Sequence, residues 1–211
     1  MAYSNDNNFL NSIPPVTRYI LIINTTIWLI CNLLKQTWLA EIFALYSING
    51  GGFLPYQLIT YMFTQLEFGH LFFNMFALFM FGRWLEQYWG PKRFLMYYMV
   101  TGIGAGLIQL LVSHLQGITS VTIGASGSVF GLLLAFGMIF PNTPLYLMFI
   151  PIPIKAKYMV IGYGVLEFFF GIVNRAGDNI AHFAHLGGML FGIILILYWK
   201  KKGIGHGNNF F

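Results

Sequence analysis

Six stretches of the chain are almost wholly apolar, and short polar segments separate them. They cover Val16–Leu34, Phe68–Tyr88, Phe94–Val112, Ala125–Phe140, Tyr158–Val173 and Ile180–Trp199. A helix that crosses a bilayer needs about 20 predominantly apolar residues, so each stretch predicts a spanning helix, although the fourth and fifth are short. The pattern therefore predicts an all-α integral membrane protein built as a six-transmembrane-helix bundle.

The composition is too apolar for a water-soluble protein. Of the 211 residues, 57% are apolar types and only 8% are charged, whereas soluble domains are about 25% charged. So few charges cannot cover a protein of this size in water, which excludes a soluble enzyme, a disordered chain and a nucleic-acid-binding protein. The single cysteine, Cys31, excludes an internal disulfide and a cysteine-based metal cluster.

The basic residues predict the orientation of the bundle. If the N-terminus lies in the cytoplasm, nine of the 11 Lys and Arg residues fall at cytoplasmic helix ends, and only Lys35 and Arg175 fall outside. Cytoplasmic loops are enriched in Lys and Arg, so both termini are predicted to lie inside. This topology also accounts for the net charge of +5 and for the run Lys200–Lys202, without a nucleic-acid partner.

The same pattern divides the chain into three parts. Residues 1–15 are expected to form a short polar cytoplasmic segment, residues 16–200 the membrane domain, and residues 201–211 a cytoplasmic tail. The first part lacks the basic start and apolar core of a signal peptide, so the first helix is expected to remain. The segment Gln36–Tyr56 is either an interfacial segment or an ordinary loop, and Pro141–Lys157, with four prolines, is expected to follow the surface.

Polar side chains gather in one layer of the predicted bundle. His70 and Asn74 lie near the start of the second helix, Ser126 at the start of the fourth, and His185 near the start of the sixth. In the predicted topology these three helices all run inward, so the four side chains lie about one or two turns below the outer surface, at ~1.5 Å per residue. Polar groups inside a membrane are costly and indicate function.

This set contains the parts of a nucleophilic serine site. A serine hydroxyl needs a base to take its proton, and a histidine on another helix, His185, is placed to do this for Ser126. His70 and Asn74, at i and i+4, share a helix face and are predicted to donate hydrogen bonds to an oxyanion, together with the Ser126 backbone N–H. A lone serine at a helix start is usually an N-cap, so this interpretation depends on the two histidine motifs.

Glycine spacing predicts close contact between the fourth and sixth helices. Gly127 and Gly131 lie four apart on one, and Gly188 and Gly192 lie four apart on the other, on the face of His185. Small residues at this spacing let membrane helices approach closely, although such pairs occur in many bundles that catalyse nothing. One turn after the serine, Phe130 is expected to stack on the imidazole of His185.

Three motifs together resemble those of the rhomboid intramembrane serine proteases. They are Gly124-Ala125-Ser126-Gly127, His70-Leu-Phe-Phe-Asn74, and Ala184-His185-Leu186-Gly187-Gly188 followed by Gly192. Each motif is short, but the three stand in the family's order on the expected helices. The resemblance covers the chain from about residue 18 to 200.

The resemblance implies a fold and an activity. It implies the six-helix form of the family, with peptide-bond hydrolysis in transmembrane protein substrates by Ser126 and His185, without an acidic third member. It also implies an oxyanion hole formed by His70, Asn74 and the amide of Ser126, and no cofactor or metal. Glu86 resembles a polar anchor at the cytoplasmic end of the second helix, and the fifth helix with the loop Val173–Asn179 is implied to move.

The chain departs from the family pattern at two positions. Phe130 stands where the family often has tyrosine, and Gln65 stands where it often has a second histidine. The short polar N-terminus, without a transit peptide, suggests a bacterial inner membrane.

Other site assignments and other function classes stay open. His182 and His185, three apart, could bind a metal with His70 or an acid as third ligand; otherwise His182 is a packing or supporting residue. Asp178 could orient an imidazole or point to solvent, and Glu167 in the fifth helix has no partner that the sequence reveals. The alternative functions are an inactive relative that binds membrane clients, and a small channel or transporter.

Overall fold

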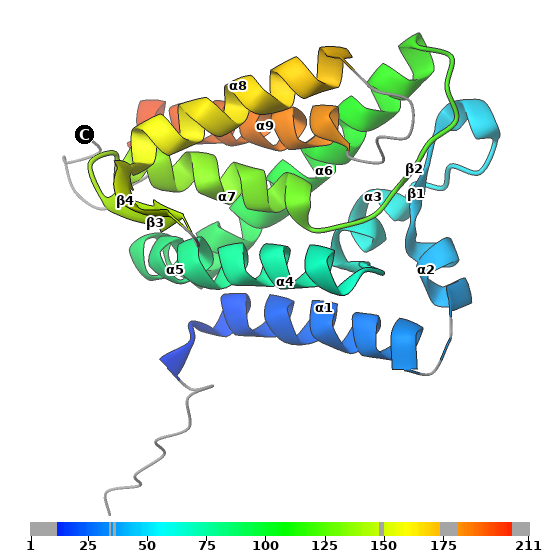
Figure 1. Ribbon diagram of the computed structural model, residues 1–211, viewed down its shortest axis with the longest axis horizontal. Coiled ribbons are helices and arrows are strands. Elements are labelled where there is room, and N and C mark those ends of the chain that lie inside the picture. Colours follow the sequence, from blue (N-terminus) through cyan, green and yellow to red (C-terminus); the bar gives the residue numbers. More distant parts are fainter. Residues whose placement is uncertain (1–11, 34, 36, 148–149, 174–180, 204–211) are drawn as a thin grey trace, which may run out of the picture.

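The structure is a computed structural model that describes residues 12–33, 35, 37–147, 150–173 and 181–203, most of them in helices (Figure 1). The long helices are α1 (Pro15–Leu33), α6 (Pro91–Leu115), α8 (Ala156–Val173) and α9 (His182–Lys201). Shorter ones are α2 (Thr37–Phe43), α3 (Gln57–Thr60), α4 (Phe68–Ala77), α5 (Arg83–Trp89) and α7 (Ser126–Ile139). Two 3-10 turns, η2 (Ile48–Gly50) and η3 (Tyr61–Phe63), and a π-helical segment, η4 (Leu78–Gly82), complete the helical elements described.

The helices follow the predicted apolar stretches. Among the described residues, four helices are long and apolar enough to cross a membrane, namely α1, α6, α8 and α9. The second stretch is continuous from α4 through η4 to α5, and α7 has only 14 residues. The prediction of a mostly helical chain suited to a membrane is confirmed, while the count of six spans and the orientation stay predictions.

Two small antiparallel sheets depart from the all-α prediction. Strand β1 (Leu45–Tyr46) pairs with β2 (Val121–Thr122), and β3 (Pro144–Leu147) pairs with β4 (Ile150–Lys155). The second sheet lies inside Pro141–Lys157, which the sequence predicts only to follow the surface. Proline lacks an N–H and breaks a helix interior, but the first residue or the edge of a strand tolerates it, so the alternating Pro and Ile of β4 form a strand.

The helices lie roughly side by side along the long axis of the molecule (Figure 1). The β3–β4 sheet lies at one end, and α2, α3 and the β1–β2 pair lie at the other. The N-terminal ends of α4, α7 and α9 are directed toward this second end. The three helices that carry the predicted site residues therefore start at the same end of the bundle.

Helices α7 and α9 meet backbone to backbone at Gly127 and Gly188. A Cβ atom on Gly188 would collide with the carbonyl oxygen of Gly127. One turn further along α9, a Cβ on Gly192 would collide with the hydroxyl of Tyr97 from α6. The predicted glycine contact is thus present, and it brings the start of α9 against the start of α7.

Replacing Gly188 by alanine is expected to separate these two helices. The added methyl has no room beside the Gly127 carbonyl, and overpacking of this kind costs about 1–3 kcal/mol. We expect Gly188→Ala to lower the unfolding temperature in detergent and to reduce any activity that needs α7 and α9 in contact. Gly162→Ala on α8 is the matched control, because among the described residues nothing outside its own stretch of helix lies within 4 Å of its Cβ position. Equal unfolding temperatures for the two variants would contradict the close contact.

Glu86 links α5 to the start of α1 through hydrogen bonds. Its carboxylate is 2% exposed and accepts hydrogen bonds from the backbone N–H groups of Val16 at 2.9 Å and Thr17 at 2.7 Å. The Thr17 hydroxyl donates a third hydrogen bond at 2.8 Å. The first N–H groups of a helix have no partner within it, and a negative charge there is favourable. The residue that resembles an anchor therefore caps a neighbouring helix.

Candidate active site

Ser126 and His185 are in hydrogen-bond contact across two helices. Ser126 is the first residue of α7, and His185 lies in the first turn of α9. The distance from His185 Nε2 to Ser126 Oγ is 2.8 Å, and His185 is only 7% exposed. They lie 59 positions apart in the sequence, so no local spacing pattern predicts the contact. The contact depends on the close approach of α7 and α9 at their glycines.

The imidazole of His185 is held by an aromatic ring on the same helix as the serine. Phe130 stacks on it with ring centroids 4.2 Å apart and planes within 10°. Tyr163 of α8 meets Phe130 edge to face at 6.2 Å. Stacking of this kind restricts the rotation of the imidazole, and phenylalanine provides it without a phenolic hydroxyl.

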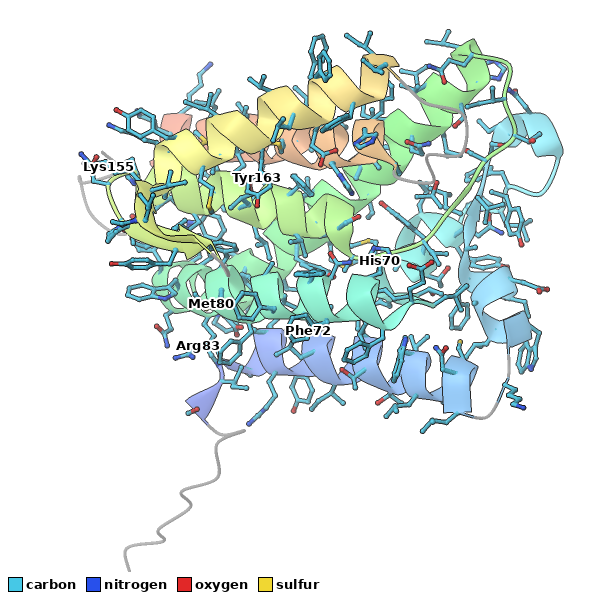
Figure 2. All side chains as sticks on the ribbon, viewed as in Figure 1. His70, Phe72, Met80, Arg83, Lys155 and Tyr163 are labelled. Carbon is cyan, nitrogen blue, oxygen red and sulfur yellow. The ribbon has the colours of Figure 1, made fainter. Side chains whose placement is uncertain are left out.

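His70 lines a cavity together with Ser126 and His185. The cavity has a volume of about 630 Å³. Its lining is Leu66, Glu67, Gly69, His70, Val121, Thr122, Ile123, Ser126, Ala181 and His185. Figure 2 shows His70 near the start of α4, beside the segment that leads into α7. The cavity can therefore admit a peptide carbonyl, or water, to Ser126 and His70 together.

Gly124 makes room for His70. Its φ of +122° is a conformation that other residues rarely adopt. A Cβ atom at this position would lie 2.6 Å from Cε1 and 2.7 Å from Nε2 of His70. The glycine of the Gly-x-Ser-Gly motif is thus required both by its backbone and by the neighbouring imidazole.

Asn74 is held differently from the other predicted site residues. It is 5% exposed, and its Nδ2 donates to Oε1 of Gln65 at 3.0 Å. Gln65 is fully buried, and its own Nε2 donates to Oδ1 of Asn24 at 2.9 Å. Asn74 does not line the cavity that Ser126, His70 and His185 share. Gln65, noted from the sequence only as a departure, supports the Asn74 amide, and no sequence pattern indicates this pairing.

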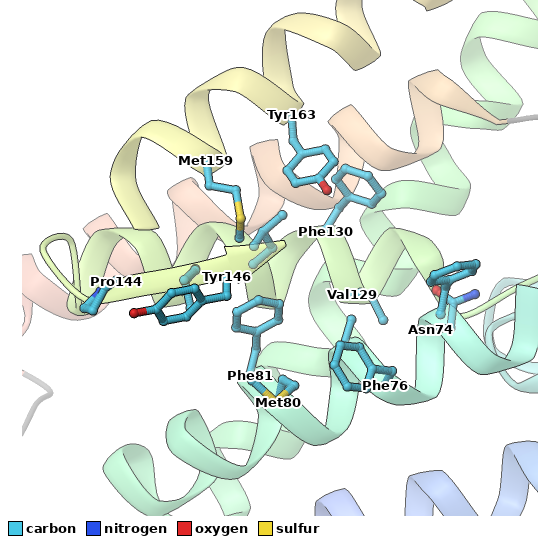
Figure 3. A pocket seen from close by; sticks show the side chains of 14 residues that line it. Asn74, Phe76, Met80, Phe81, Val129, Phe130, Pro144, Tyr146, Met159 and Tyr163 are labelled. Atoms are coloured by element: carbon cyan, nitrogen blue, oxygen red, sulfur yellow. The ribbon is translucent and has the colours of Figure 1, made fainter. Parts of the chain in front are cut away.

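A second, apolar pocket lies beside the site (Figure 3). Its volume is about 420 Å³, and α4, η4, α7, α8 and β3 contribute to its walls. Its lining is Phe73, Asn74, Phe76, Ala77, Met80, Phe81, Val129, Phe130, Leu133, Pro144, Leu145, Tyr146, Met159 and Tyr163. Phe130 therefore lines this pocket and also stacks on His185.

The structure supplies a partner for Glu167. Its Oε2 lies 2.7 Å from Nδ1 of His182 and 2.9 Å from Nδ1 of His185. Their possible ligand atoms all lie within 4.8 Å of one another, so this cluster of one acid and two histidines could hold a metal ion. Asp178, the other acid considered from the sequence, lies outside the described residues, as does most of the loop Val173–Asn179.

Comparison with known proteins identifies the family. A family model described as the Rhomboid domain matches residues 54–202. The chain belongs to the rhomboid family. The predicted resemblance is thereby confirmed.

Relatives of this rhomboid occur in organelles and in bacteria. Mitochondrial rhomboid protein 1 of Saccharomyces cerevisiae is 33% identical over 141 residues, which are 66% of this chain and 40% of that protein. Chloroplastic rhomboid-like protein 11 of Arabidopsis thaliana is 26% identical over 191 residues, 87% of this chain and 65% of its own length. The candidate rhomboid protease YdcA of Bacillus subtilis is 29% identical over 193 residues, which are 89% of this chain and 90% of that protein. The matches thus span 40 to 65% of the length of these two organellar relatives.

Proposed function

We propose that this rhomboid is an intramembrane serine endopeptidase that cleaves transmembrane segments of other proteins. Ser126 is the nucleophile and His185 the base. The observation that carries the proposal is the distance of 2.8 Å between His185 Nε2 and Ser126 Oγ beside an open cavity. An inactive client-binding relative would not need this pair, and a channel would need polar groups spread through the depth of the bundle.

The reaction follows from the geometry of the pair. His185 Nε2 takes the hydroxyl proton as Ser126 Oγ attacks the scissile carbonyl carbon, and a tetrahedral oxyanion forms. His185 then returns this proton to the leaving amine, and the C–N bond breaks to leave an acyl-enzyme. Water from the cavity of about 630 Å³ repeats the sequence and releases Ser126. No cofactor is required for these steps.

The oxyanion is proposed to bind three donors. They are the His70 side chain, the Asn74 amide and the backbone N–H of Ser126 at the start of α7. His70 already lines the cavity with Ser126. Asn74 donates one N–H to Gln65 and keeps a second N–H for the oxyanion, since an amide nitrogen carries two.

The substrate is proposed to be a membrane helix that is cut near its outer end. The pocket of about 420 Å³ beside Asn74 and Phe130 is apolar and suits aliphatic or aromatic side chains of such a helix. A helix must unwind before its carbonyls are accessible, and unwinding is easiest near a terminus and at glycine. Movement of α8 is proposed to admit the substrate.

The topology and location are part of the same proposal. Residues 16–200 form a multi-pass domain of six spans with both termini in the cytoplasm, flanked by residues 1–15 and 201–211. The continuous helix over 68–89 and the common direction of α4, α7 and α9 support this arrangement. The location proposed is a bacterial inner membrane, and one of the relatives is from a bacterium, Bacillus subtilis.

The proposal is tested with purified protein in liposomes. A reporter with one apolar segment and a glycine pair near its outer end is incubated with the wild type and with Ser126→Ala. We expect the wild type to release two fragments whose masses locate the cut inside the apolar segment near its outer end. The Ser126→Ala sample should keep the reporter intact. Cleavage by both proteins, or cuts confined to soluble parts of the reporter, would contradict the proposal.

A further inference from the structure

Glu167 is an acidic residue in the middle of an otherwise apolar part of α8. The three residues that follow it, Phe168, Phe169 and Phe170, are exposed to between 46% and 57%, whereas the Glu167 side chain is only 13% exposed. A carboxylate in a spanning helix is costly unless it faces the bundle interior and has a partner. Glu167 meets both conditions, because α8 packs against α9 and both of its partners come from α9.

The two partners contact the same oxygen in different ways. His182 Nδ1 makes an aligned hydrogen bond with Glu167 Oε2 at 2.7 Å. His185 Nδ1 lies 2.9 Å from the same oxygen, but its N–H is not aligned with it. Among the described residues, this buried nitrogen has no aligned hydrogen-bond partner.

The proposed role of His185 as base determines which of its nitrogens must carry the proton. Ser126 can give up its proton only if Nε2 of His185, 2.8 Å away, has a free electron pair. The ring proton of the neutral imidazole must then be on Nδ1, where a buried N–H needs an acceptor. Glu167 Oε2 is at the right distance for that acceptor.

We propose that Glu167 is a positioning residue that holds His185 as the Nδ1–H tautomer and stabilises the imidazolium formed when Ser126 attacks. This inference rests on the proposed function. It adds an acid on α8 to the Ser–His pair, where the family resemblance implies a dyad without an acidic third member. The carboxylate acts through His185 and does not touch the substrate.

The arrangement predicts an effect on turnover more than on substrate binding. To act as the base, His185 must start neutral, and it becomes positively charged when it takes the serine proton. The attraction between Glu167 and His185 is therefore stronger in the transition state, and interactions of this kind raise kcat and leave KM nearly unchanged. His182 bonds to the same carboxylate oxygen, and Phe170 stacks on His182 with ring centroids 5.8 Å apart.

The test compares Glu167→Gln, Glu167→Asp and the wild type on the liposome reporter. Glutamine keeps the size of the side chain and removes its charge, so we expect kcat to fall roughly 10²- to 10⁴-fold, with KM within about threefold. Aspartate keeps the charge on a chain shorter by one carbon, so it should recover part of kcat. Glu41→Gln, an exposed acid on α2, is the matched control and should behave as the wild type.

Two further measurements separate positioning from a loss of folding. The unfolding temperature of Glu167→Gln in detergent should stay close to that of the wild type. Nitrogen-15 NMR of histidine-labelled protein should show His185 protonated on Nδ1 in the wild type, and a shift toward the Nε2–H tautomer in Glu167→Gln. A structural role alone would lower the unfolding temperature without changing the tautomer, and that result would overturn the inference.

Failure of the proposed function and failure of the proposed role of Glu167 would give different results. A wild type that neither cleaves nor depends on Ser126 would refute the proposed function itself. A Ser126-dependent wild type with kcat within threefold of Glu167→Gln would refute only the role of Glu167. If a chelator such as EDTA reduces the wild type to the level of Glu167→Gln, the three groups hold a metal ion and the positioning role is wrong.

Discussion

Ser126→Ala and His185→Ala are each expected to reduce turnover of a transmembrane substrate by on the order of 10⁴- to 10⁶-fold. The pair acts as a unit, because the hydroxyl of Ser126 is not nucleophilic without the base that lies 2.8 Å from it. The double variant should therefore be hardly slower than either single variant. The measurement is kcat on the liposome reporter, with unfolding temperatures recorded for all three proteins.

His182→Ala is the control for the choice of histidine. His182 is as buried as His185 and lies three residues before it, but its Nδ1 bonds to Glu167. We expect this variant to keep substantial activity. An inactive His182→Ala protein that is still folded, or a His185→Ala protein with near-normal turnover, would show that the base is assigned to the wrong residue.

Loss of an oxyanion donor should have the next largest effect. We expect His70→Ala and Asn74→Ala each to lower kcat by about 10²- to 10³-fold, because each removes one hydrogen bond that is strongest in the transition state. Both variants should still form a covalent adduct at Ser126 with a reactive phosphonate, although more slowly. Asn142→Ala, an exposed asparagine in the turn before β3, is the matched control and should be unaffected.

The role of Asn74 can also be tested through Gln65, the buried residue that accepts a hydrogen bond from its amide. Gln65 orients the Asn74 amide through a hydrogen bond of 3.0 Å. Gln65→Leu should therefore lower kcat, although residue 74 is still asparagine in this variant. Unchanged turnover in Asn74→Ala would remove Asn74 from the oxyanion hole. Unchanged turnover in Gln65→Leu alone would mean that Asn74 keeps its orientation without this support.

Much of the helical fold follows from the length of the apolar stretches. Such stretches must form helices in a membrane because every backbone N–H and C=O needs a partner within the segment. The strands could not be predicted in the same way. Strand β1 pairs only two residues with β2, more than 70 positions away, and no local pattern indicates so short a pairing. The β3–β4 hairpin has a signal in its prolines, which exclude a helix but do not reveal a partner strand.

In the candidate site, too, the parts that short motifs indicate could be predicted, and the contacts between distant segments could not. Ser126, His185 and His70 are predicted from short motifs together with the direction of the helices that carry them, and the structure brings them around one cavity. The contact of Glu167 with His182 and His185 depends on how α8 lies against α9. Membrane helices pack through shape and small residues rather than a readable repeat, so the sequence alone could not supply this contact.

The most direct measurement of the central claim is covalent labelling by a fluorophosphonate. The reagent phosphonylates an activated serine hydroxyl and loses fluoride, so it reports the nucleophile without a knowledge of the natural substrate. After labelling of the wild type in detergent, digestion and mass spectrometry should find one modified peptide, with the phosphonate on Ser126, and Ser126→Ala should remain unlabelled. A folded wild type that is not labelled, or a label on another serine that persists in Ser126→Ala, would contradict the assignment.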